Sequence, residues 1–189
     1  MERDLPLPTY AAKPVAEANG HTMYDVRDVT NFVLDTADQR RVDITNLSLQ
    51  KLLYFIHGWF YSIYEEPLIK SKFEAWQYGP VQRVIYDQFK SCKDQPIRNL
   101  RATHLNPENG ESIYRSPNIA PDHARLIEQI LEKYEKFTAG QLVEKSHIED
   151  GPWEYVWQQA EEVVYPGMRI PDAMILDHFK RLSPILTVH

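Results

Sequence analysis

The side chains that could do chemistry are few, and they form no recognisable catalytic pattern. His147 precedes Glu149 by two residues, a spacing that does not place both side chains on one helix face. Cys92 could act as a nucleophile, although a small residue at a helix end is the simpler interpretation. His57 stands in an apolar run, where a half-buried packing role is more common than catalysis. We therefore expect no catalytic residue, metal site or cofactor, and a hydrolase or transferase that uses His147 is the less favoured alternative.

Composition and charge exclude several further classes of protein. The 189 residues contain no glycine-rich phosphate loop, paired-histidine zinc motif or nucleophile elbow. A single cysteine fits a reducing cytoplasm. The net charge of -6, without a basic run, argues against DNA binding and favours a partner with a basic surface. No apolar stretch could span a membrane and no signal-peptide core is present, so we expect a cytoplasmic protein without membrane contact.

The elements that must position these residues are expected to be mainly helices. Residues 1–22 contain prolines and little apolar periodicity, which predicts a flexible lead before a domain over residues 23–189. Valines at helical spacing predict a first helix over about residues 23–40. The segment Ser48–Glu65 is apolar on most sides, as is typical of a central helix. Close packing of another backbone would explain Gly58 in its middle.

Short extended segments interrupt the helices in the middle of the chain. Alternation over residues 72–77 predicts a strand, and Pro80 is well placed as the first residue of a following helix. A turn at residues 105–110 predicts a small hairpin, which could pair with that strand. Thr138 and Gln141 have capping-box spacing. Other helices are expected to begin near Pro121, Trp153 and Pro171. The fold class expected is mainly α, a single helical domain with a small antiparallel β-sheet or hairpin.

Several short blocks combine aromatic residues, glycine and proline in a distinctive order. They are Ser48–Phe55, Gly58-Trp59, Pro67-Leu68, Glu74–Val81, Ser146-His147 and Pro152-Trp153. Together the blocks resemble the Panacea-domain family of SocA- and GepA-like proteins, over about residues 23–183. The sequence departs from the family pattern at His57, where many relatives have glutamine, and it has no added helix-turn-helix domain.

The resemblance implies that the protein is an antitoxin, not an enzyme, and that its partner is a cognate protein toxin. Family members neutralise toxins of several unrelated kinds, and related genes often occur in prophages. In the SocA branch the antitoxin is also a proteolytic adaptor that delivers its toxin to the ClpXP protease, which is the alternative function. The family-motif residues of this sequence are Lys51, Leu52, Leu53, Tyr54, Glu74, Gly79 and Pro80.

Structural and binding roles are both open for the motif residues that are charged. Lys51 and Glu74 stand inside apolar blocks. They could pair with each other and brace the strand against the central helix, or they could belong to an exposed binding surface. The leucines of the first block are expected in the core.

Two turn-rich blocks, Glu74–Val81 and Ser146–Trp153, are expected to lie close together although they are distant in sequence. Both mix aromatic with polar residues, a combination that suits protein interfaces. The simple interpretation places Trp76 and Trp153 in the core. The sharper hypothesis is a small polar groove made by Gln77, Tyr78, His147 and Trp153. With Trp76, these four are the candidate partner-binding residues.

Overall fold

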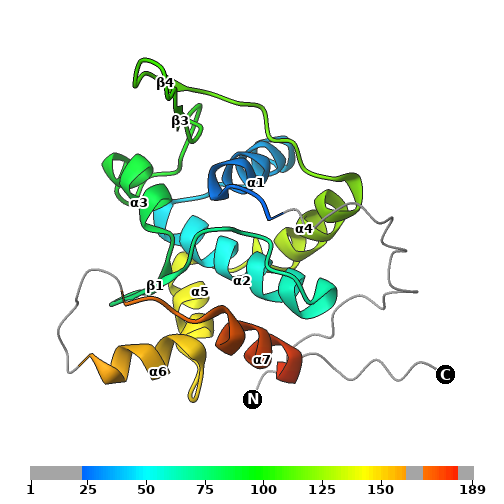
Figure 1. Ribbon diagram of the computed structural model, residues 1–189, viewed down its shortest axis with the longest axis vertical. Helices are drawn as coiled ribbons and strands as arrows, with labels where there is room; N and C mark the ends of the chain where they lie inside the picture. Colours follow the sequence, from blue (N-terminus) through cyan, green and yellow to red (C-terminus); the bar gives the residue numbers. More distant parts are fainter. Residues whose placement is uncertain (1–22, 161–167, 183–189) are drawn as a thin grey trace.

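Helices make up most of the fold in the computed structural model, which describes residues 23–160 and 168–182 (Figure 1). The predicted flexible lead, residues 1–22, lies outside the described residues. The helices within them are α1 (Val26–Arg40), α2 (Asn46–Tyr64), α3 (Arg83–Phe89), α4 (Pro121–Tyr134), α5 (Ala139–Ser146), α6 (Pro152–Gln159) and α7 (Asp172–Leu182). The strands are β1 (Glu74–Trp76), β2 (Gly79–Val81), β3 (His104–Leu105) and β4 (Ser112–Ile113), and a 3-10 turn, η1 (Lys90–Cys92), follows α3. The expected mainly α fold class is confirmed.

Helix α2 lies in the middle of the structure, and the other helices are arranged around it (Figure 1). Every residue from Ser48 to Phe60 is buried, because α4, α5, α7 and the β1–β2 hairpin all contact this helix. A capping box starts it: the Thr45 hydroxyl accepts from Ser48 N at 3.2 Å, and the Ser48 hydroxyl accepts from Thr45 N at 2.9 Å. The predicted central helix is therefore confirmed.

Two details of α2 differ from the sequence-based expectation. His57 is fully buried, not half-buried, and its Nδ1 accepts from Ile69 N at 3.3 Å. Burial lowers the pKa of His57 to about 4, so the ring is neutral at pH 7. Gly58 meets the ring of Phe179 on α7, not another backbone, and an added Cβ would collide with that ring. The missing side chain at Gly58 is thus what lets α7 approach α2.

The two hairpins form separate sheets, so the expected pairing between them is wrong. β1 pairs with β2 and β3 pairs with β4, both antiparallel. The free edge of β1 is instead taken by residues 168–170: Ala75 N donates to Met168 O, and Ile170 N donates to Phe73 O, both at 2.8 Å. That pairing leaves no place on β1 for the second hairpin.

Pro80 does not begin a helix, which corrects a second expectation. It lies in β2, and α3 starts three residues later at Arg83. The reason is Gly79, whose φ of 95° turns the chain back on itself, so that the following residues run as a return strand. Other helix starts agree with the sequence, since Thr138 and Gln141 form the predicted capping box.

Exchange of Gly58 for alanine tests the contact between α2 and α7. We expect Gly58→Ala to lower the free energy of unfolding by about 1–3 kcal/mol, because the new methyl group overpacks the Phe179 ring. Gly140→Ala in α5 is the matched control, since nothing lies within 4 Å of its added Cβ. It should leave stability unchanged or raise it by up to about 1 kcal/mol. Equal effects of both substitutions in urea unfolding would contradict this packing.

Candidate functional site

The two turn-rich sequence blocks meet at the β1–β2 hairpin, as expected. Trp153, at the start of α6, donates its Nε1 hydrogen to the carbonyl of Trp76 at 2.8 Å. The hairpin also contacts α5, and Figure 1 shows α5 and α6 beside β1. The close approach of Glu74–Val81 and Ser146–Trp153 is therefore confirmed.

Lys51 of α2 binds the β1–β2 hairpin from the core side. The side chain is fully buried, and its Nζ donates to the carbonyl of Pro80 at 2.8 Å. Burial lowers the pKa of Lys51 to about 7. The pairing with Glu74 and the exposure on a binding surface are therefore wrong, whereas the expected bracing of the sheet against the central helix is confirmed through Pro80.

Glu74 makes its contacts away from α2. Its Oε2 accepts from Trp76 Nε1 at 2.9 Å and lies 3.8 Å from Arg83 Nε. Strand alternation explains this arrangement, because the fully buried Ala75 faces the core and its two neighbours in β1 face the other way. Glu74 therefore cannot reach Lys51.

Gly79 allows the hairpin to lie directly on the helices beneath it. A Cβ at this position would lie 2.5 Å from Ser146 Oγ and 2.9 Å from Lys51 Nζ. Its positive φ also disfavours any other residue. The glycine therefore meets a steric and a backbone requirement at once, and it brings β2, α2 and α5 into contact.

Buried amides complete the attachment of the hairpin. Gln50 Oε1 accepts from Gln82 N at 2.9 Å, and Gln50 Nε2 donates to Asn46 Oδ1 at 3.0 Å. The Gln82 side chain in turn accepts from Ser71 Oγ at 2.7 Å. Because these groups satisfy one another, burying them costs little, and they fix where β2 ends and α3 begins.

Within the hairpin, residues 74–81, only the tip residues Gln77 and Tyr78 are exposed. Tyr78 is 60% exposed, although the residues on both sides of the two-residue tip are held by the contacts above. Trp76 was expected in the core, but it is half-buried. Its ring contacts the edge of Tyr86, with the ring centroids 4.9 Å apart, and the Arg83 guanidinium carbon lies 5.7 Å from its centroid. The hairpin thus presents one large exposed aromatic ring on a rigid support.

A groove of about 430 Å³ runs beside the hairpin tip. It is lined by Asn46, Leu47, Gln50, Trp76, Gln77, Tyr78, Val81, Tyr86, Lys90 and Lys93. Three of the five candidate residues, Trp76, Gln77 and Tyr78, belong to it. The sequence alone did not indicate the contributions of α3 and η1, since nothing in their local pattern sets them beside the hairpin.

His147 and Trp153 do not line this groove, so the single polar groove expected from the sequence is wrong. Their rings stack at 3.6 Å, nearly parallel. Trp153 is buried, as its expected core role requires. Burial and the charge of Lys51 lower the pKa of His147 against the opposing effect of Glu154, and its buried Nε2 contacts no hydrogen-bond partner among the described residues. His147 therefore supports Trp153 by stacking on its ring, and Trp153 in turn bonds to the hairpin.

The remaining family-motif residues build the core. Leu52, Leu53 and Tyr54 are all buried on α2, and the Tyr54 ring makes edge contacts with Phe73 and Phe179. Within the described part of the chain, no three histidine, cysteine, aspartate or glutamate side chains cluster as a metal site would require. None of the helices described there has the length and apolar character needed to cross a membrane.

The buried Lys51 makes a testable contribution to pH dependence. Its pKa is about 7 in the folded protein and near 10.5 when exposed, so the unfolded chain binds more protons between these values. The free energy of unfolding should therefore rise with pH across that window. The contribution of Lys51 to it should be smallest below pH 7. Relative to Lys51→Met, the parent should gain about 2 kcal/mol between pH 7 and pH 9 in urea unfolding. Parallel pH profiles for the two proteins would show that Lys51 is not buried as described.

Comparison with known proteins shows which family the sequence resembles. A family profile described as "Antitoxin SocA-like, Panacea domain" matches residues 49–154, from the start of α2 into α6. Antitoxin SocA of Caulobacter vibrioides (strain NA1000 / CB15N) is 38% identical over 156 residues, covering 82% of this chain and 82% of that relative. No solved structure matches the chain. The chain therefore belongs to the SocA-like, Panacea-domain antitoxin family.

Proposed function

We propose that this protein is the antitoxin of a toxin–antitoxin system and that it neutralises its cognate protein toxin by direct binding. Family membership supports the antitoxin role. The observation that carries the direct-binding proposal is Tyr78, an exposed aromatic residue at the tip of the β1–β2 hairpin. The rest of this hairpin is bonded to α2, α6 and residues 168–170. The site of action is the cytoplasm, where the free Cys92 would stay reduced.

The hairpin suits binding because it is ordered before the partner arrives. Fixing a flexible loop on association costs free energy. Here the carbonyls of Trp76 and Pro80 already accept from Trp153 and Lys51, and Gly79 packs against Ser146 of α5. A tyrosine on such a support covers a large area and loses little conformational entropy. Residues of this kind, beside an apolar groove, are where binding energy concentrates in protein interfaces.

Two other functions share parts of this arrangement but have less support. A proteolytic adaptor for ClpXP would bind the toxin with the same surface and differ only in the fate of the complex. An enzyme built on His147 would need that ring free to act, but its face is covered by Trp153. Direct neutralisation is therefore the proposal to test first.

Substitution of Tyr78 separates a binding role from a structural one. We expect Tyr78→Ala to weaken toxin binding at least tenfold and to reduce growth rescue, with little change in melting temperature, because the side chain is exposed. Tyr114→Ala is the matched control, since Tyr114 is 51% exposed but lies next to β4, outside the groove. His147→Ala should lower the melting temperature first, because it removes the stack on Trp153.

The experiment co-expresses the antitoxin with each open reading frame that flanks its gene. Failure to rescue growth from any toxic neighbour would overturn the proposed function. Rescue by Tyr78→Ala at the parental level would show that the hairpin tip is not the binding surface. Direct blocking predicts rescue with an unchanged amount of toxin, whereas an adaptor would lower toxin abundance and lose rescue in cells without ClpXP.

A further inference from the structure

We infer that the groove beside Tyr78 binds an extended, acidic segment of the toxin, with an apolar side chain in the groove and a carboxylate against Lys93 and Lys90. This inference rests on the proposed function and names the chemistry of the partner at the same site. It follows from three properties of the lining: its apolar walls, the sign of its charges and its size.

Aromatic and aliphatic side chains from three elements make the walls of the groove. Tyr78 and Trp76 come from the β1–β2 hairpin, Tyr86 from α3 and Leu47 from the first turn of α2. Leu47 is 36% exposed, so part of its side chain is open to a partner. Covering these side chains removes apolar area from water, and so the groove favours a partner that brings an apolar side chain of its own.

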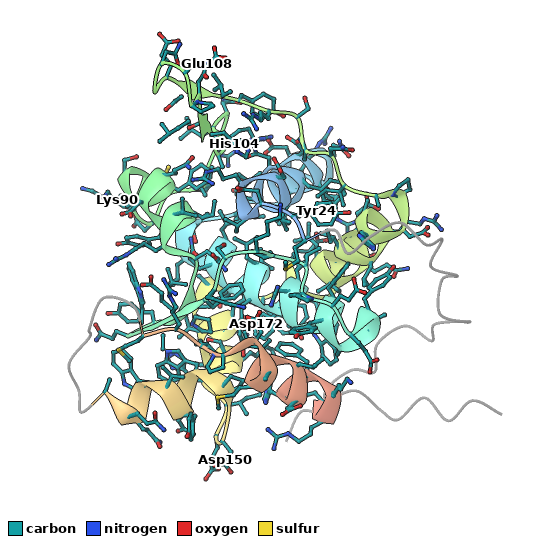
Figure 2. The ribbon with its side chains drawn as sticks, in the orientation of Figure 1. Tyr24, Lys90, His104, Glu108, Asp150 and Asp172 are labelled. Carbon is teal, nitrogen blue, oxygen red and sulfur yellow. The ribbon has the colours of Figure 1, made fainter. Side chains whose placement is uncertain are left out.

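The charged residues that line the groove are both cations. Lys90 lies at the outer end of α3 and points away from the body of the protein (Figure 2). It pairs with the exposed Asp87 at 3.0 Å. Lys93 lines the same groove and makes no ion pair with any residue in the described ranges. The groove therefore carries positive charge on a chain whose net charge is -6.

Among the described carboxylates, Asp87 offsets the charge of Lys90, whereas none forms an ion pair with Lys93. Glu74 is held by Trp76 Nε1 and faces Arg83, and it does not line the groove. Asp94 follows Lys93 in sequence but is exposed and accepts from Gln95 Nε2 at 3.1 Å, away from the lining. A carboxylate from a partner would thus meet two ammonium groups with at most one of them already paired. The acidic excess of the whole chain, which favoured a basic partner, does not describe this surface.

The position of Lys93 is fixed by the backbone around it. Its N–H donates to Lys90 O at 3.2 Å, and Gln95 N donates to Cys92 O at 2.9 Å, so the turn that ends η1 is closed on both sides. Lys93 adopts a positive φ of 53° in this turn. The backbone of Lys93 is therefore held beside the groove.

The size of the groove favours an extended segment over a helix. A volume of about 430 Å³ is at the lower end of ordinary ligand pockets, and it suits one or two side chains. The exposed Gln77 amide, at the hairpin tip, offers a donor and an acceptor to a passing backbone.

Charge reversal at Lys93 tests this chemistry. With the purified toxin as the probe, we expect Lys93→Glu to weaken binding at least tenfold in 50 mM NaCl and much less in 500 mM NaCl, because salt screens the repulsion. Lys93→Gln should fall between the parent and Lys93→Glu. The control is Lys70→Glu, at another exposed lysine outside the groove. It should bind like the parent, and melting temperatures of all variants should agree.

The outcomes distinguish the inference from the function on which it rests. A parent that binds and neutralises the toxin while Lys93→Glu binds equally well would overturn the acidic segment and leave the antitoxin role intact. Tighter binding by Lys93→Glu would also overturn it and would point to a basic segment in the groove. A parent that binds no product of the flanking genes would overturn the proposed function, and the inference with it.

Discussion

The hydrogen bond from the buried Lys51 amine to the carbonyl of Pro80 is the constraint on which the rest of the site depends. It joins the central helix to the return strand of the hairpin, at a place where Gly79 leaves no space between them. A buried lysine is tolerated because burial lowers its pKa to about 7, so that it can be neutral near physiological pH. With β2 fixed to α2 in this way, the hairpin tip can be exposed and rigid at the same time.

Buried and exposed residues of the sequence motifs have different roles. Leu52, Leu53 and Tyr54 make the core of α2, and Lys51 and Gly79 attach the hairpin to it. These residues specify a fold, and a fold alone does not select a partner. Selection requires exposed side chains, and we propose that those of the hairpin tip and of the η1 turn supply them.

The sequence predicted the parts of the structure that depend on local pattern. Apolar periodicity identified α2, and side-chain spacing identified the capping box at Thr138. One error is local, since Gly79 turns the chain so that Pro80 enters a strand and not a helix. The others concern packing between distant segments. Pairing of Lys51 with Glu74 failed because strand alternation turns the carboxylate outward, and the groove was missed because Lys93 lies beside the hairpin only after folding. Gly58 did indicate a close approach to α2, but nothing in α2 showed that the approaching group is the Phe179 ring of α7.

Hydrogen–deuterium exchange of the antitoxin, with and without bound toxin, is the most direct measurement of the central claim. The account predicts slower exchange on both sides of the groove, at Trp76–Tyr78 and over residues 86–93. It predicts no change at the tip of the β3–β4 hairpin, residues 106–111, which lies away from the groove. Slower exchange confined to that hairpin or to other distant surfaces, with the groove unaffected, would contradict it.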